Sequence, residues 1–321
     1  MRIVEVLLGV ADAGSRLGGD SPPLANLPAA GFTTLALLLL AAAILRGLSW
    51  GSGIHIQFAR RFLEEDLPEL PPDLQSLLRH HEDQFLYGNI APDIISYKNY
   101  GGLKNHCHNW NIRERLREHA ESPADEAFIW GYLCHLAADV VAHQHFVPFH
   151  IVYELPPRVF GHLYWEARYD GTVAPDHWQR IDSLRLDRAL RDSDQLILKA
   201  VPKRAFPYST NKLIFNHVLL ARSRRSWRKI IDGAIARRPA PTFVEHFVDQ
   251  CLEECSEQLR RVFRESDEKE LISRDPNGHA ELAETTTLRK QLRAESANSA
   301  TALEASRAAA EERFGLPARD R

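Results

Sequence analysis

The sequence predicts an all-α protein that contains many helices. Apolar residues recur at helical spacing from residue 54 onward, and no alternating run is long enough to predict a β-sheet. The chain is 44% hydrophobic and 26% charged, which suits a soluble globular protein. Its 321 residues allow one large domain or two small ones.

The first elements of the folded part are short. Residues 54–64 place apolar and basic positions at helical spacing, and residues 73–82 repeat this pattern more weakly. Residues 88–106 are rich in glycine and asparagine, which predicts a loop.

Residues 123–146 predict the best-defined helix. Ser122 can cap its first turn, Pro123 suits the first helical position, and the acidic residues that follow favour the positive end of the helix dipole. Pro148 is expected to end this helix, because proline disrupts a helix interior.

The second half of the chain predicts further helices. A helix is expected over 157–169, and amphipathic helices are expected over 182–200, 210–234 and 242–265. Residues 266–321 are rich in Glu, Ala and Arg with few large apolar residues, so we expect a solvated helical or disordered tail outside the functional core.

The N-terminal segment, residues 1–49, predicts a leader. Residues 32–45 form an apolar run that is short for a membrane span and typical of a signal-peptide core. The small-x-small pattern at 47–49 predicts cleavage after Ser49, which would export the protein to the periplasm or the medium with Trp50 as its first residue. The alternative is an uncleaved membrane anchor through residues 27–45, because the segment before the apolar run is poor in basic residues.

Two pairs of histidine and carboxylate residues predict metal binding. The sequence contains His135-x3-Asp139-x5-His145 and His162-x3-Glu166. Side chains spaced i,i+4 share one face of a helix, so each pair can close on one metal ion.

Charge and cysteine content exclude other classes of function. A formal net charge of −3 supplies no global basic field, so we expect no stable nucleic-acid partner. The four cysteines form no CxxC pair and are too few for a disulfide scaffold.

Five segments in a fixed order resemble the zinc-dependent phospholipase C family, which shares a helical fold and a three-zinc site with the S1/P1 nucleases. They are Trp-Gly-Ser-Gly-Ile-His at 50–55, Gly-Asn-Ile-Ala-Pro-Asp at 88–93, His-Cys-His-Asn-Trp at 106–110, and the two His/carboxylate motifs. The resemblance implies a helical domain of the phospholipase C/P1 nuclease type over residues 50–265.

The resemblance also implies a site for up to three zinc ions. Asp139 would bridge two ions, the free amine of Trp50 would bind one of them, and Asp93 would also serve as the general base. The implied metal ligands are Trp50, His55, Asp93, His106, His135, Asp139, His145, His162 and Glu166.

Two of these ligands have rivals nearby in the sequence. His108 competes with His106, because the loop leaves the geometry open; the resemblance implies His106. His143 stands four residues after Asp139, so an unbroken helix favours it over His145, which the family spacing prefers.

The function implied by the resemblance is hydrolysis of a phosphodiester by a zinc-activated water, with removal of a phospholipid headgroup. A phospholipid or another phosphodiester would be the substrate, and association with a membrane surface would accompany it. Ile94 and Leu103 stand where choline-selective members carry aromatic residues, so phosphatidylcholine is not assured. The alternatives are an S1/P1-like single-strand nuclease or nucleotidase, and a non-catalytic, membrane-anchored metal-binding protein.

Overall fold

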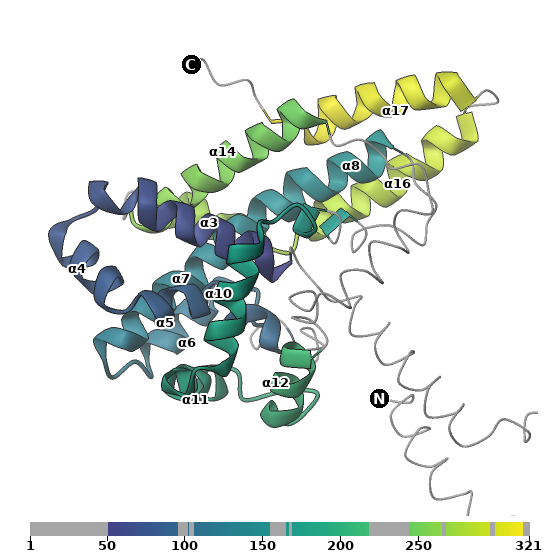
Figure 1. The fold of residues 1–321 in the computed structure, drawn as a ribbon. Coiled ribbons are helices and arrows are strands. Elements are labelled where there is room, and N and C mark those ends of the chain that lie inside the picture. Colours follow the sequence, from purple (N-terminus) through teal and green to yellow (C-terminus); the bar gives the residue numbers. More distant parts are fainter. Residues whose placement is uncertain are drawn as a thin grey trace, which may run out of the picture. The chain divides into compact units, whose positions relative to one another are not determined.

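A computed structural model describes residues 51–95, 102, 106–154, 165–166, 169–217, 244–264, 268–295 and 299–316. Within these ranges the chain forms helices and turns without any strand, which confirms the all-α prediction (Figure 1). All of them belong to one unit of the chain, Ile44–Arg321. The apolar run 32–45 lies outside the described residues, and no helix among those described has the length and hydropathy needed to cross a bilayer.

Helix α7 (Pro123–Val141) runs through the core. Its start matches the prediction, because the Ser122 side chain accepts from the backbone N–H of Asp125 while the Asp125 side chain accepts from the backbone N–H of Ser122. Every residue from Gly131 to Val141 is buried, so this part of α7 has no solvent-facing side. His135 and Asp139 therefore lie inside the core, where polar groups require partners.

Helix α5 (Glu82–Gly88) packs closely against α7. A Cβ atom on Gly131 would lie 2.0 Å from the carbonyl oxygen of Phe85, and one on Gly88 would lie 2.2 Å from that of Phe128. Only glycine permits such a close approach of two helix backbones. The contact brings the end of α5, including Asn89, beside His135.

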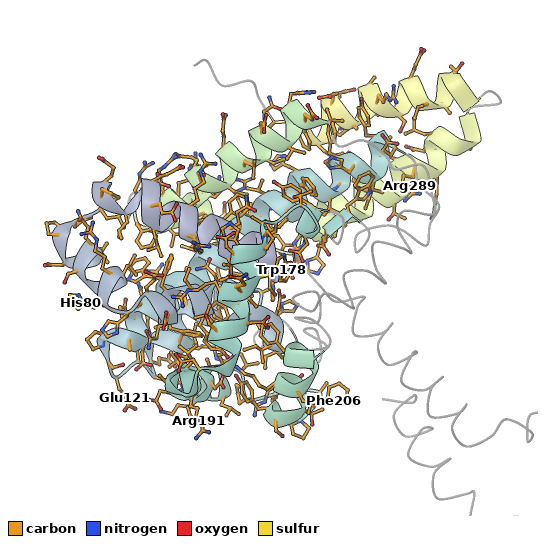
Figure 2. All side chains as sticks on the ribbon, viewed as in Figure 1. His80, Glu121, Trp178, Arg191, Phe206 and Arg289 are labelled. Carbon is orange, nitrogen blue, oxygen red and sulfur yellow. The ribbon has the colours of Figure 1, made fainter. Side chains whose placement is uncertain are left out.

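Helix α3 (Ser52–Glu65) agrees with the helix expected over 54–64 and packs against α10 (Pro175–Leu186). Asp170 accepts a hydrogen bond from the backbone N–H of Ile54 at 3.2 Å and so satisfies part of the N-terminus of α3. Trp178 of α10, labelled in Figure 2, lies so close to Gly53 that a Cβ there would be 2.6 Å from its ring. These contacts hold the first turn of α3, which carries His55, against the core.

The helical path continues beyond the predicted end at Pro148. A π-helical segment, Ala142–Phe146, follows α7, and α8 (Val147–Tyr153) continues from it. The prediction that Pro148 ends the helix was wrong, because Pro148 occupies the first turn of α8, where a missing N–H is tolerated. Single-turn π segments occur often at functional sites.

The smaller elements pack around this core. The region predicted as one helix over 182–200 is divided between α10, a 3₁₀ turn (Arg188–Leu190) and α11 (Arg191–Ala200). The residues expected at 157–169 and 210–234 lie largely outside the described residues. The remaining elements here are 3₁₀ turns Leu67–Glu69 and Ala91–Ile94, α4 (Pro72–His80), α6 (Ile112–Arg117) and α12 (Tyr208–His217).

The C-terminal helices pack on the same unit. Helix α14 (Glu245–Val262) contacts α7, and both α16 (His279–Glu295) and α17 (Ser299–Phe314) contact α8, as Figure 1 shows. A short helix, α15 (Glu268–Ser273), connects the two parts. The expected tail is therefore helical over most of its length and packs on the residues that follow α7.

Candidate metal centre

Five buried side chains from four segments meet beside the middle of α7. None is more than 5% exposed. His55 comes from α3, Asp93 from the 3₁₀ turn Ala91–Ile94, His108 from the turn before α6, and His135 and Asp139 from α7. All except His108 are residues that the sequence predicted as ligands.

Asp139 lies at the centre of this cluster. Its Oδ1 is 3.3 Å from His55 Nε2, and its Oδ2 is 3.1 Å from His135 Nε2 and 3.3 Å from His108 Nε2. His108 Nε2 also lies 3.3 Å from Asp93 Oδ1. One carboxylate therefore faces three imidazoles, and a second carboxylate reaches one of them.

The orientation of His135 suits metal binding. Its Nδ1 donates to the carbonyl oxygen of Asn89 at 2.8 Å and so carries a proton, while its Nε2 faces Asp139 and His108 and can bind a metal ion once it is deprotonated. The two Nε2 atoms of His135 and His108 are 3.1 Å apart, and the rings of His55 and His135 stack at 3.9 Å.

Burial and neighbouring charges shift the pKa values of the residues in this cluster. Burial alone would raise the pKa of Asp139, but His135 and His55 hold that pKa well below its usual range. Burial acts to lower the pKa of His135, yet Asp139 and Asp93 outweigh it and raise that pKa. Burial and the neighbouring His135 lower the pKa of His55.

These residues fit a metal ion. The nitrogen and oxygen atoms of His55, His135 and Asp139 lie within 4.8 Å of one another, as do those of Asp93, His108 and His135. Both Asp139 oxygens are buried without a well-directed hydrogen bond among the described residues. Imidazole nitrogen and carboxylate oxygen are the donors that zinc takes in catalytic sites.

A second pair of candidate ligands lies at the end of α7. His143 Nε2 is 3.4 Å from Glu166 Oε1, and both residues are buried. His143 Nδ1 bonds the carbonyl oxygen of Pro276 at 2.5 Å. This ring therefore also presents Nε2 to a carboxylate while its other nitrogen is held by a backbone carbonyl.

In each of the two competing pairs, the histidine that lies near a carboxylate is not the one expected from the sequence. These histidines are His108 and His143. His106 accepts a hydrogen bond from the backbone N–H of His108 and does not belong to either convergent group among the described residues. His145 lies beside the carbonyl oxygen of Phe314 at 3.1 Å and the guanidinium of Arg274 at 3.2 Å. The other two expected ligands, Trp50 and His162, lie outside the described residues.

The sequence analysis did not identify the loop 274–278, which contacts the candidate ligands His108 and His143. Asn277 donates from its side-chain amide to the carbonyl oxygen of His108 at 2.8 Å, and Trp110 donates to the carbonyl oxygen of Arg274 at 2.8 Å. Gly278 has φ +56°, and a Cβ there would lie 2.3 Å from the carbonyl oxygen of His143. Nothing local to residues 274–278 signals this role, because every partner is remote in sequence.

Comparison with known proteins bears on the part of the chain that carries the cluster. Residues 54–204 match the family model described as zinc dependent phospholipase C. The matched range contains every candidate ligand in the described residues, and it ends well before the loop 274–278. No curated protein and no solved structure matches the chain.

Proposed function

We propose that this chain, whose residues 54–204 match the model of the zinc-dependent phospholipase C family, is a zinc-dependent hydrolase that removes the headgroup of a phospholipid. The observation that carries the proposal is the convergence of three imidazoles and two carboxylates in the core, at distances of 3.1–3.3 Å. A cluster of this kind is costly to bury without a cation, because its carboxylates are taken out of water.

The donor geometry suggests how these residues would share metal ions. His135 would serve one ion through Nε2, because its Nδ1 donates to the Asn89 carbonyl, whereas Asp139 has two oxygens and could serve two ions. We assign Asp93, His108, His135 and Asp139 to the first zinc ion. Asp139 and His55 would bind the second.

A further zinc ion would be bound by His143 and Glu166, together with His162. The 3.4 Å contact between His143 and Glu166 favours His143 over His145 for this role. Because the arrangement of His162 is not described, its place in this set rests on the spacing His162-x3-Glu166 alone.

When bound, zinc supplies Lewis-acid polarisation of a phosphoryl oxygen and lowers the pKa of a coordinated water. Asp93 would take the proton of the attacking water as its oxygen bonds to phosphorus. The bond from phosphorus to the diacylglycerol oxygen would break, and the proton would pass to that leaving oxygen. Burial of Asp93 keeps its carboxylate away from bulk water and oriented by the contact with His108.

The residues near the cluster do not indicate selection for one phospholipid headgroup. Ile94, which follows Asp93, is fully buried and offers no aromatic face to a quaternary ammonium. We therefore expect activity on phospholipids without strict selection for choline.

The test is turnover and metal content of the full chain. The zinc-loaded protein is assayed on phospholipids of several headgroups and on single-stranded DNA, with diacylglycerol and released nucleotides as the two readouts. Asp93→Asn is expected to lower kcat by about 10²–10⁴, the range for loss of a general base. Asp176→Asn, which changes an exposed carboxylate paired with Arg60, serves as the matched control.

Zinc content of Asp93→Asn separates its two roles. Retained zinc with lost turnover would support the base assignment, and lost zinc would support a ligand role. Undiminished turnover in this variant would rule out Asp93 as the base. Nucleotide release without diacylglycerol would replace the phospholipase proposal with the nuclease alternative, and zinc binding without either product would leave the non-catalytic binding protein.

We propose that the protein is exported and cut after Ser49. A chain beginning at Trp50 would place a free amine two residues before α3, whose first turn carries His55. N-terminal sequencing and zinc analysis of protein exported by its own host are the measurements. A first residue of Trp50 is expected, while an intact leader would favour membrane anchoring and would remove that amine from the ligand set.

A further inference from the structure

A cavity of about 180 Å³ opens where α6 and the turn before it, α7, the end of α14 and α15 meet. This volume is that of about six water molecules. None of its lining residues is a candidate metal ligand. They are Trp110, Arg113, Arg117, Trp130, Leu133, Arg261, Val262, Phe263, Arg264, Leu271 and Ile272.

The charged side chains that line this cavity are all arginines: Arg113, Arg117, Arg261 and Arg264. Carboxylates stand beside three of them without lining the cavity: Arg117 is 3.9 Å from Glu126, Arg261 is 2.7 Å from Glu270, and Arg264 is 3.0 Å from Glu257. These partners orient the guanidiniums and offset part of their charge. Arg117 and Arg261 each carry five N–H donors, and their carboxylate contacts use only some of them.

Aromatic rings form one wall of the cavity. Trp130 stacks on Phe263 with ring centroids 4.7 Å apart, and the Arg117 guanidinium lies 5.7 Å from the Trp130 ring centre. The indole N–H of Trp130 is buried and has no acceptor among the described residues.

An exposed apolar side chain lies on the same cavity. Ile272 is 45% exposed, and among described residues the other large hydrophobic side chain of comparable exposure is Leu213, at 61%. Leu213 belongs to α12 and does not line the cavity. An exposed isoleucine beside four guanidiniums matches a surface in which anionic phosphates adjoin hydrocarbon.

We propose that this cavity binds the phosphate of an anionic phospholipid and thereby holds the protein on a membrane surface. Guanidinium groups bind phosphate through pairs of N–H donors. Ile272 enters the apolar boundary of the bilayer beside the bound headgroup. This binding uses no candidate metal ligand, so it does not require turnover.

The experiment is sedimentation of the zinc-loaded full chain with vesicles on ice, with diacylglycerol release measured to show that turnover stays negligible. Vesicles of phosphatidylcholine alone are compared with vesicles that also contain phosphatidylglycerol. Binding to the anionic vesicles is expected to fall about thirtyfold when Arg117→Gln and Arg264→Gln are combined, because each arginine near an anionic surface contributes about fivefold. Arg61→Gln removes an exposed arginine on α3 that also pairs with a carboxylate, and it is expected to leave binding unchanged.

Paired apolar variants test the insertion of Ile272. Ile272→Ser is expected to weaken binding to anionic vesicles, whereas Leu213→Ser, at the more exposed position, is expected to leave it unchanged. Equal binding to neutral and anionic vesicles, or equal effects of the two serine variants, would overturn the proposal. Inorganic phosphate provides the last arm: if it binds with the same affinity as the vesicles and is lost with the same arginines, the cavity is a site for free phosphate instead.

Discussion

At the scale of single residues, the charge on Asp139 dominates the centre. A carboxylate in the interior of a buried helix is unfavourable unless neighbouring groups compensate it. Three imidazoles approach it within 3.3 Å, and two of these rings come from outside α7. The competing histidines in each motif can therefore be distinguished by substitution.

The first residue-scale prediction concerns His108 and His106. His108→Ala removes a nitrogen 3.3 Å from both Asp93 and Asp139, so zinc affinity is expected to fall by about 100-fold or more. His106→Ala is the matched control and is expected to change zinc affinity far less. Titration of each variant against a competing zinc chelator measures this, and the reverse order would restore His106 as the ligand.

The second residue-scale prediction compares His143 with His145. His143→Ala leaves Glu166 without the imidazole nitrogen at 3.4 Å, and one zinc ion per chain is expected to be lost. His145→Ala removes contacts with Phe314 and Arg274 and is expected to retain the full zinc content. Metal analysis of the two purified variants decides between them. Loss of zinc only from His145→Ala would contradict our assignment.

At the scale of elements, the centre depends on close contacts between segments that carry no ligand and segments that do. Helix α5 approaches α7 so closely that the carbonyl of Asn89 can accept from His135 at 2.8 Å. The loop 274–278 holds the turn of His108 and the ring of His143. A change to either contact is expected to alter the orientation of the candidate ligand rings and thereby weaken zinc binding.

Gly131→Ala tests the approach of α5 to α7. The added Cβ would lie 2.0 Å from the Phe85 carbonyl oxygen, which is backbone and cannot rotate away. The free energy of unfolding is expected to fall by about 1–3 kcal/mol, as for other overpacked cores. Urea unfolding measures this change, and zinc affinity is expected to weaken as well because Asn89 shifts from His135. Unchanged stability would mean that the two helices separate at no cost.

Asn277→Ala tests the loop 274–278. The variant removes the donor to the His108 carbonyl oxygen at 2.8 Å, and zinc affinity is expected to fall about tenfold, as for other groups that orient a ligand. His279→Ala changes an exposed residue two positions away that contacts Asp275 and is the control. An equal loss of zinc affinity in both variants would indicate a general effect on the loop. Unchanged affinity in Asn277→Ala would exclude a positioning role.

At the scale of the whole molecule, the candidate centre connects parts of the chain that are far apart in sequence. The hydrogen bond from Asn277 to His108 spans 169 residues, and that between His143 and Pro276 spans 133. Helices α16 and α17 pack on α8, and the loop 274–278 that precedes α16 contacts the centre, although the match to the family model ends at residue 204. Metal binding and the folding of the C-terminal helices should therefore be coupled.

Chelation is the whole-molecule prediction. Removal of zinc is expected to lower the melting temperature, because an ion bound only by the folded state adds about 2.7 kcal/mol at a concentration 100 times its Kd. Scanning calorimetry with and without chelator measures the shift, and restored zinc should reverse it. Hydrogen exchange of α16 should rise on chelation. An unchanged melting temperature would argue against zinc as a resident ion.

Local sequence determined much of the fold. The capping pair Ser122 and Asp125 begins α7, and the spacing of His135 and Asp139 puts both on one helix face, since such features depend only on near neighbours. The helix over 54–64 could be recognised for the same reason. The sequence did not predict that the helical path continues past Pro148, nor that residues 182–200 are divided between two helices. Packing overrides local preference at helix ends.

Only the tertiary structure decided which competing histidine lies with the carboxylates. His106 and His108 occupy one turn, and their sequence context is nearly the same, so the choice depends on how that turn is held by Asn277. The contact of His143 with Glu166 depends equally on the remote Pro276. Residue types and local spacing predict that a metal centre exists, because ligand chemistry belongs to side chains. Its actual membership depends on long-range contacts, which leave no periodic signal in the sequence.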